Sequence, residues 1–212
     1  MAITVDAQVF SSSDASDTTL TFAHTCSGSN RLLVVTVPES RSQTATVTYN
    51  GVAMTSAVAQ SNSTTWARIF YLIAPATGSN NVVITYSSAL TFRQAGAISF
   101  NGVDQTSPLG ATNAIFGTIQ NKSIGITTTE DNSVLVDSLA VNSSNQTPTA
   151  GQTLIGAQSI GLNRVGAYEI VGSAGAYSQT YSAPISEDYS MVVAEFKEAV
   201  NAVNNGAFLL MF

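Results

Sequence analysis

Hydrophobic and polar residues alternate with a period of two along most of the chain, the pattern of strands that bury one face. Ile3, Val5, Ala7 and Val9, for example, are separated by polar neighbours. Residues 31–37 form a denser apolar run, which predicts a strand buried on both faces. Helical spacing is almost absent. The further strands that the pattern predicts are residues 20–22, 44–49, 66–73, 82–86, 92–100, 122–128, 133–141, 152–158, 164–171, 177–182 and 190–197.

Turn signals separate these segments, and Asn50-Gly51 is the strongest of them because both residues tolerate a positive φ. About a dozen short strands at a spacing of roughly 8–12 residues are typical of a sandwich or a barrel. We therefore predict an all-β protein, an antiparallel β-sandwich of jelly-roll-like type. Residues 1–198 form a single domain in this prediction, and residues 199–212 form a linker and an apolar docking tail.

One short sequence echo bears on internal repetition. Residues 49–55 and 100–106 each carry an aromatic residue, an Asn-Gly pair, a valine and a threonine at the same spacing. The echo indicates either a duplicated hairpin or the same turn chemistry used twice. The second interpretation is favoured because Asn-Gly turns are common in β proteins.

The charged fraction changes the picture of the surface. Charged residues make up 9% of the chain, against roughly 25% in typical soluble domains. Hydrophobic residues make up 44%, so the chain has enough apolar material for a core and lacks the composition of a disordered protein. An uncharged surface rich in hydroxyl groups suits strands and close packing between proteins. This composition is common in secreted bacterial modules and in virion proteins.

The net charge of −6 and the spacing of the basic residues argue against nucleic-acid binding. Phosphate backbones require clustered lysine and arginine. The basic residues of this chain are instead scattered singly: Arg31, Arg41, Arg68, Arg93, Lys122, Arg164 and Lys197.

The N-terminal residues lack the basic and long apolar regions of a signal peptide, and no segment has the ~20 apolar residues of a spanning helix. Either a leader has been removed, or the protein is made in a host cytoplasm and released by lysis, as phage structural proteins are. The single cysteine, Cys26, cannot form an internal disulfide. We interpret it as a small buried hydrophobic residue.

Candidate catalytic chemistry depends on one histidine. His24 and Cys26 are placed on one strand face, but a Cys–His pair needs the thiolate within hydrogen-bond reach of the imidazole, which this spacing rarely gives. A zinc site needs more His or Cys than the chain has. We expect no catalytic, cofactor-binding or metal site and no enzymatic activity.

The carboxylates are the remaining candidates for chemistry. A glycosidase needs a facing pair of them, and a calcium ion needs several loop oxygens. We interpret the carboxylates mainly as groups that solvate or cap turns. Those considered for a glycosidase pair lie in predicted strands: Asp137, Glu169 and Glu195. Those considered for calcium lie in predicted turns: Asp14, Asp17, Glu187 and Asp188.

Aromatic residues offer a glycan-binding alternative, because several of them on one exposed face would stack on sugar rings. A tyrosine or tryptophan is equally suited to a sandwich core, and the core is favoured for each of these residues. The residues concerned are Trp66, Tyr71, Tyr86, Tyr168, Tyr177, Tyr181 and Tyr189.

Four segments together resemble a poorly characterised β-sandwich module found in phage tail and virion-associated proteins and in secreted bacterial proteins. They are residues 47–55, 71–78, 97–110 and 192–197, and the most distinctive is Phe100-Asn-Gly-Val-Asp-Gln-Thr-Ser-Pro-Leu109. The resemblance covers roughly residues 1–198. It implies a β-sandwich architecture and a viral or extracellular setting, and it implies no catalytic residues.

The end of the sequence carries the strongest candidate for docking. Five consecutive large apolar residues follow the Asn204-Asn205-Gly206 joint: Phe208, Leu209, Leu210, Met211 and Phe212. Exposing such side chains to water costs on the order of 1.5–3 kcal/mol each. Either they add a strand to their own sandwich, or they insert into a neighbouring subunit or surface.

Together these observations predict a non-enzymatic structural protein of a viral (phage) particle, such as a capsid decoration, minor capsid or tail/fibre component. We expect it to be a homo-oligomer that binds other copies of itself and other virion or surface proteins. It would be made in the host cytoplasm and located in the virion. The alternatives are a secreted carbohydrate-binding or adhesin module and a subunit of an extracellular filament, either of them extracellular or at the cell surface.

Overall fold

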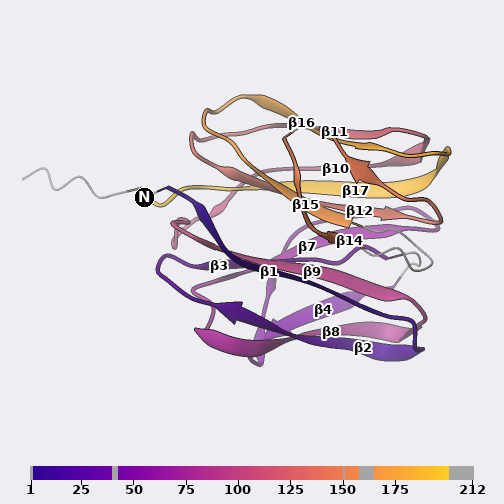
Figure 1. The fold of residues 1–212 in the computed structure, drawn as a ribbon, viewed down its shortest axis with the longest axis horizontal. Helices are drawn as coiled ribbons and strands as arrows, with labels where there is room; N and C mark the ends of the chain where they lie inside the picture. Colours follow the sequence, from indigo (N-terminus) through magenta and orange to yellow (C-terminus); the bar gives the residue numbers. More distant parts are fainter. Residues whose placement is uncertain (1, 40–42, 150, 158–164, 201–212) are drawn as a thin grey trace, which may run out of the picture.

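A computed structural model describes residues 2–39, 43–149, 151–157 and 165–200. These residues form seventeen antiparallel strands and no helix (Figure 1). The all-β, antiparallel sandwich prediction is confirmed, whereas the jelly-roll description stays a prediction. The strands are β1 (Thr4–Ser13), β2 (Asp17–Cys26), β3 (Leu32–Thr36), β4 (Ala45–Tyr49), β5 (Val52–Ala53), β6 (Thr55–Ser61), β7 (Trp66–Ile73), β8 (Gly78–Leu90), β9 (Arg93–Asn101), β10 (Leu109–Ile119), β11 (Lys122–Thr127), β12 (Val134–Val141), β13 (Thr147–Pro148), β14 (Thr153–Ala157), β15 (Val165–Ile170), β16 (Ala176–Ser182) and β17 (Glu187–Phe196).

The strands make four sheets that are stacked as four layers (Figure 1). An outer sheet with the order β2-β8-β4-β5 covers a five-stranded sheet with the order β1-β9-β3-β7-β6. The latter packs on a second five-stranded sheet, β10-β17-β12-β15-β14, which is covered by the outer sheet β11-β16-β13. The sandwich therefore has two central sheets that are covered on both faces and two outer sheets that face solvent on one side.

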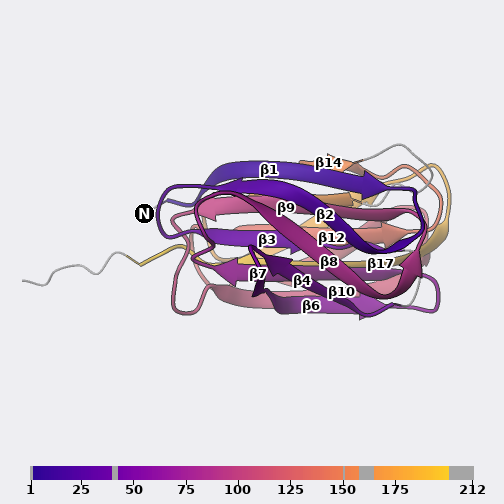
Figure 2. The ribbon, with the colours of Figure 1, turned by 90° about the horizontal axis from the view of Figure 1, so that it is seen from below.

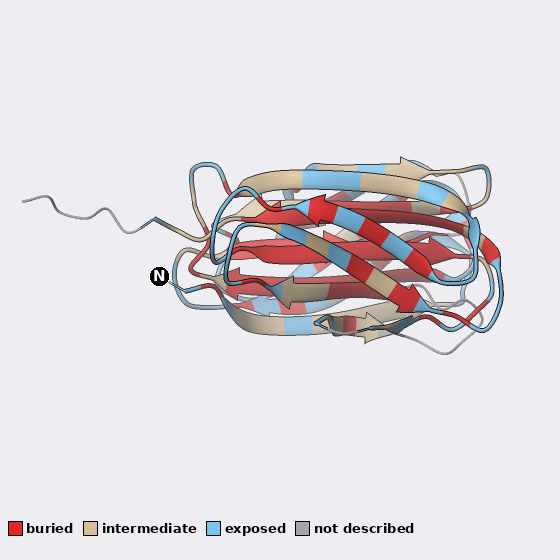
Figure 3. Ribbon diagram, turned by 90° about the horizontal axis from the view of Figure 1, so that it is seen from above, coloured by how far each residue is buried: buried red, intermediate tan, exposed pale blue. Residues whose placement is uncertain are grey.

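Three apolar cores lie between the four layers. The central strands are buried along their whole length, as β3 and β12 show, because both of their faces meet another sheet (Figure 3). This confirms the prediction from the dense apolar run at residues 31–37. Outer strands instead alternate, and β11 is buried at every second residue. The period-two pattern of the sequence thus arises mainly in the outer layers.

The two halves of the chain have the same topology. In the first half, β1 to β9 make one outer and one central sheet, and in the second half β10 to β17 do the same. The central sheets correspond strand by strand, β1-β9-β3-β7-β6 to β10-β17-β12-β15-β14, and so do the outer strands β2-β8-β4 and β11-β16-β13. Only the two-residue strand β5 has no counterpart. The fold is therefore an internal duplication.

The strand registers of the two halves also correspond. In each central sheet one residue of the middle strand lies directly between a phenylalanine and an isoleucine. These triplets are Phe100, Leu32 and Ile73 in the first half and Phe196, Val134 and Ile170 in the second. The irregularities match as well, because β1 and β10 are each bulged near their start, and β6 and β14 are bulged at corresponding residues.

An approximate two-fold axis relates the halves across the central interface. Strand β1 contacts β14 along one flank of the molecule, and β10 contacts β6 along the other (Figure 2). Exchanging the halves converts the first pair of strands into the second. The interface between the central sheets is thus of the self-complementary kind found in two-fold dimers, although a single chain provides both sides.

The two Asn-Gly pairs do not mark this duplication. Asn50-Gly51 makes the β4–β5 hairpin, whereas Asn101-Gly102 ends β9 and leads into the second half. Gly51 and Gly102 both have a positive φ, near 77°, which explains why the same pair of residues occurs at both turns. The echo in the sequence therefore reflects shared turn chemistry at positions that do not correspond.

Gly156 illustrates how closely the central sheets approach on the β1/β14 flank. A Cβ atom at this position would collide with the Cβ and ring of Phe10. Gly156→Ala is expected to lower the free energy of unfolding by about 1–3 kcal/mol, the usual cost of overpacking. Chemical denaturation of Gly156→Ala, alone and with Phe10→Gly, which removes the Cβ as well as the ring of Phe10, measures this cost, which should shrink in the double variant.

Gly172→Ala provides the control for this measurement, because a Cβ there would contact nothing within 4 Å. It is expected to change the free energy of unfolding by less than about 0.5 kcal/mol. Equal effects of the alanines at positions 156 and 172 would contradict the close approach of β1 and β14.

Candidate functional site

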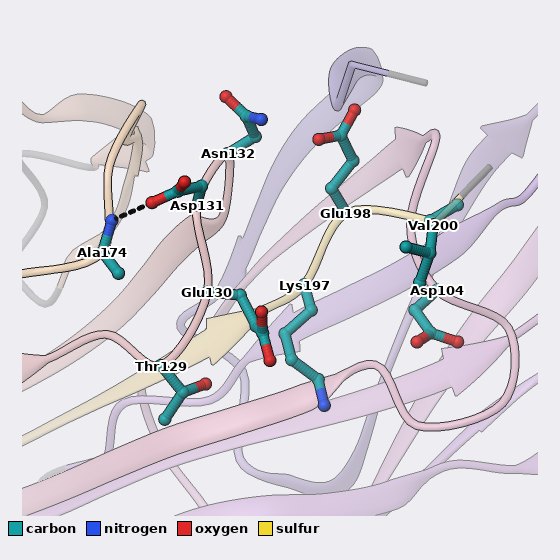
Figure 4. A pocket seen from close by; sticks show the side chains of 10 residues that line it. Asp104, Thr129, Glu130, Asp131, Asn132, Ala174, Lys197, Glu198 and Val200 are labelled. Carbon is teal, nitrogen blue, oxygen red and sulfur yellow. Dashed lines mark hydrogen bonds between the residues drawn. The ribbon is translucent and has the colours of Figure 1, made fainter. Parts of the chain in front are cut away.

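A hollow of about 620 Å³ opens at the end of the molecule where the chain leaves β17 (Figure 4). Residues 197–199 are fixed there by backbone hydrogen bonds to residues 102, 104 and 108. Val200, the next residue, is 87% exposed and lies on the rim. The hollow is lined by Asp104, residues 129–132, Ala174 and residues 197–200.

The carboxylates around this hollow shape its loops. Asp104 accepts hydrogen bonds from the backbone N–H groups of Thr106 (2.7 Å) and Ser107 (3.2 Å). These bonds, chiefly the one from Thr106, lower the pKa of Asp104. Asp131 accepts from the N–H of Ala174 at 2.7 Å (Figure 4). Both side chains therefore act as turn caps, as the sequence predicts for carboxylates in loops.

A fully buried carboxylate, Glu195, positions the loop that forms one wall. It accepts bonds from the backbone N–H groups of Ala111, Thr129 and Glu130 at 2.8–3.2 Å. The hydroxyls of Thr129 and Ser133 also donate to it. Burial alone would raise the pKa of Glu195, but these hydrogen bonds outweigh burial and lower it. A carboxylate held in this way is a structural anion and is closed to a substrate.

His24 and Cys26 lie inside the first half and not at an opening. The His24 Nε2 atom is 3.0 Å from the hydroxyl oxygen of Ser99, which in turn donates to Asp6 at 2.9 Å. Burial lowers the pKa of His24 to about 4 and raises the pKa of the Cys26 thiol. At neutral pH the pair is therefore an uncharged imidazole and a thiol, which is unsuited to nucleophilic catalysis.

The strand carboxylates considered for a glycosidase pair are likewise directed inward. Asp137, fully buried, accepts from the Tyr181 hydroxyl at 2.5 Å and from Gln152 Nε2 at 2.8 Å. Burial raises the pKa of Asp137 to about 7. Glu169 accepts from Gln179 at 2.7 Å. Asp137 and Glu195 are both 0% exposed, so they offer no paired carboxylates to a bound sugar.

The carboxylates considered for calcium have other partners within the protein. Glu187 is buried against Lys122, while the neighbouring Asp188 bonds to the hydroxyls of Thr64 and Thr118. Asp17 lies 3.9 Å from Arg93. Within the described residues, no group of three or more His, Cys, Asp or Glu side chains is arranged to hold a metal ion.

Every tyrosine and the tryptophan lie in the described part of the chain. Four of them are buried, and Trp66, Tyr71, Tyr168 and Tyr177 are half-buried. Trp66 stacks on Arg68, whose guanidinium carbon is 3.9 Å from the ring centroid. Tyr71 and Tyr168 make ring contacts with Phe196 and Phe100 in the central core. These contacts hold the rings of Trp66, Tyr71 and Tyr168 against other side chains of the protein.

The predicted docking residues, Phe208, Leu209, Leu210, Met211 and Phe212, lie outside the described residues. The described part of the chain nevertheless contains a feature that the sequence did not single out. Phe116 and Ile119 of β10 are 61% and 50% exposed, and they lie at the free edge of a central sheet. A signal was present, because residues 109–119 contain no charged residue and no proline.

The described residues contain no helix that could cross a membrane. Comparisons of the chain with models of protein families, with curated proteins and with solved structures gave no match.

Proposed function

We propose that this chain is a non-enzymatic structural protein of a viral (phage) particle, such as a capsid decoration, minor capsid or tail/fibre component. It acts by docking on copies of itself and on other particle proteins. The observation that carries the proposal is the lack of charged residues and proline along most edge strands of the central sheets. Edge strands β6, β10 and β14 contain no charged residue and no proline.

Unprotected edges of this kind favour assembly. A free edge presents a row of N–H and C=O groups to another strand, so monomeric proteins protect their edges with lysine, proline or inward-pointing charges. β1 carries one charged residue, Asp6, and its carboxylate is held by Ser27 and Ser99. Three of the four edge strands of the central sheets therefore lack the charges and prolines that usually protect an edge.

The distribution of basic residues supports the same proposal. Arg68, Arg93 and Lys122 are all buried, with at most 4% of each residue exposed. Arg68 pairs with Glu39 at 3.0 Å, and Lys122 lies 3.5 Å from Glu187. These three charges lie in the interior, so the described surface has few positive groups and suits uncharged contacts.

The alternatives make different demands on the surface. A carbohydrate-binding or adhesin module needs several aromatic residues on one exposed face, whereas each tyrosine and the tryptophan are buried or half-buried. A filament subunit would use the same uncharged edges, but it would polymerise without a particle. Indefinite homopolymers of the purified protein would favour the filament, and saturable binding on a glycan array would favour the binding module.

The apolar segment 208–212 is the second element of the proposal, since it docks on a neighbouring subunit. The test is the full chain carrying Phe208→Asn, Leu210→Asn and Phe212→Asn, which we call the polar-tail variant. Light scattering and electron microscopy should show a larger assembly for the unmodified chain than for this variant, because docking removes apolar side chains from water and so lowers the free energy. A chain with Asn204→Ser and Asn205→Ser is the control and should assemble normally. Equal assembly of the unmodified chain and the polar-tail variant would contradict a role for the segment.

A further inference from the structure

Strand β10 is the longest uncharged edge strand of the two central sheets. Its bulge lies at its start, between Leu109 and Thr112, so residues 112–119 run in regular register with β17. Strand β1, its counterpart, is covered in part by β14, because Phe10 packs over Gly156 and Gln8 Nε2 donates to the carbonyl of Leu154 at 3.4 Å. Strand β10 contacts β6 on its own flank, but Phe116 remains 61% exposed.

The sequence of β10 is complementary to itself when it is read in the opposite direction. Taking Ile115 as the centre, Ala114 falls opposite Phe116, and Asn113 falls opposite Gly117. Thr112 falls opposite Thr118. In the first two pairs a smaller residue, Ala114 or Gly117, lies opposite a larger one. The third pair consists of two threonines, a cross-strand pair that stabilises antiparallel sheets. An antiparallel pair of identical strands requires this self-complementarity, and a different partner would not.

Charge also favours a second copy at this edge. The chain carries a net charge of −6, so two copies repel each other unless they meet where charge is absent. The edge strand β2 of one outer sheet begins at the exposed Asp17. Edge strand β10 has no charged residue, and the nearby Asp188 is bonded to Thr118 and Thr64.

We propose that β10 pairs antiparallel with β10 of a second copy, about a two-fold axis at Ile115. The sheet β10-β17-β12-β15-β14 then continues across the dimer. In the single chain, the N–H of Ala114 is bonded to the Asn113 side chain at 2.8 Å. In the dimer, this N–H passes to the carbonyl of Phe116 of the second copy, so one hydrogen bond replaces another and the apolar burial of Phe116 is gained. The inference rests on the proposed function, since it names one of the contacts by which the subunit assembles.

The first test measures mass by light scattering in the polar-tail variant, so that segment 208–212 takes no part. We expect twice the 22.0 kDa of the chain. Adding Phe116→Lys should return the mass to that of one chain, because a lysine on the edge blocks pairing. The matched control Thr21→Lys, at an exposed position of β2, should leave the dimer intact. A polar-tail variant with the mass of one chain overturns the proposal, and so does a dimer that survives Phe116→Lys.

The second test uses cysteine cross-linking, which is clean here because the native Cys26 is fully buried. Ile115→Cys should form a disulfide between chains on mild oxidation, since directly opposed residues bring their Cα atoms within disulfide range, about 4.4–6.8 Å. Thr21→Cys should not. Equal cross-linking at positions 115 and 21 overturns the proposed axis.

The two proposals fail in different ways. If the unmodified chain assembles no further than the polar-tail variant, the docking role of segment 208–212 fails while the β10 dimer stands. If the polar-tail variant has the mass of one chain, the β10 interface fails while docking of the segment stands.

Discussion

Replacing Glu195 by alanine should lower the free energy of unfolding by about 3–5 kcal/mol, because several buried donors lose the acceptor that they share. The substitution leaves three backbone N–H groups, those of Ala111, Thr129 and Glu130, without their acceptor. Each buried donor without a partner costs about 1–3 kcal/mol. Chemical denaturation at neutral pH measures the loss.

Two variants make this result specific. Glu195→Gln keeps the shape of the side chain but replaces one acceptor oxygen by a donor, so an intermediate loss is expected. Glu130→Ala removes an exposed carboxylate from the same loop and should change the free energy of unfolding by less than about 0.5 kcal/mol. If the alanines at positions 195 and 130 had equal effects, Glu195 would not hold the loop.

The pH dependence of stability follows from the same carboxylate. The pKa of Glu195 is lowered from its ordinary value of 4.5 on folding, so its contribution is present above that value. This contribution is lost as the pH falls through the lowered pKa of the folded state. Asp137 acts in the opposite direction, since its raised pKa of about 7 removes stability as the pH rises from about 4 to 7. The difference between the wild type and Glu195→Gln below pH 5 therefore isolates Glu195.

Replacing Lys122 by methionine should lower the free energy of unfolding by about 1.5–3 kcal/mol, the range for a hydrogen bond to a charged group. Glu187 loses its buried cation but keeps the hydrogen bonds from Ser143, Ser144 and Gln146. The Lys122 Nζ atom is 3.5 Å from Glu187 Oε1 and donates to the carbonyl of Gln120 at 2.9 Å. Burial lowers the pKa of Lys122, and Glu187 opposes that shift. Denaturant titration of the Lys122→Met variant measures the loss.

The double variant Lys122→Met with Glu187→Gln removes both charges and should recover part of this stability. The interaction free energy then follows from the four measurements of a double-mutant cycle. Lys197→Met, at a half-exposed lysine, is the surface control and should have an effect below about 0.5 kcal/mol. If the double variant were less stable than Lys122→Met, the stability lost in Lys122→Met could not be assigned to a Glu187 carboxylate without its cation.

The fold class could be predicted because most strands have a strong local pattern. Residues 66–73 and 133–141 are rich in β-branched and aromatic residues and correspond closely to β7 and β12. Strand β6 was missed because it is built mainly from small residues, and β10 was missed because glycine, alanine and threonine interrupt the alternation of its large side chains. The exposed Phe116 was missed with them, since it lies in β10.

The duplication and the four layers could not be predicted from the sequence, because they depend on contacts between distant strands. Leu32 and Val134 occupy corresponding places, but only the registers that join them to β9 and β17 reveal it. The catalytic candidates show the same limit. The spacing of His24 and Cys26 indicates a shared face, whereas the layer that covers this face decides that Ser99 and not Cys26 bonds the ring.

The approximate two-fold axis has a consequence for how the two flanks diverged. A dimer of identical chains repeats each contact on both sides of its two-fold axis. A substitution that improves a contact on one side therefore also occurs on the other side. In this chain Phe10 lies over Gly156 on one flank, and the corresponding places on the other flank hold Ala114 and Val58. The large and small residues have exchanged strands. Because both halves belong to one chain, the two copies of each position can differ, so the two flanks need not carry the same contacts.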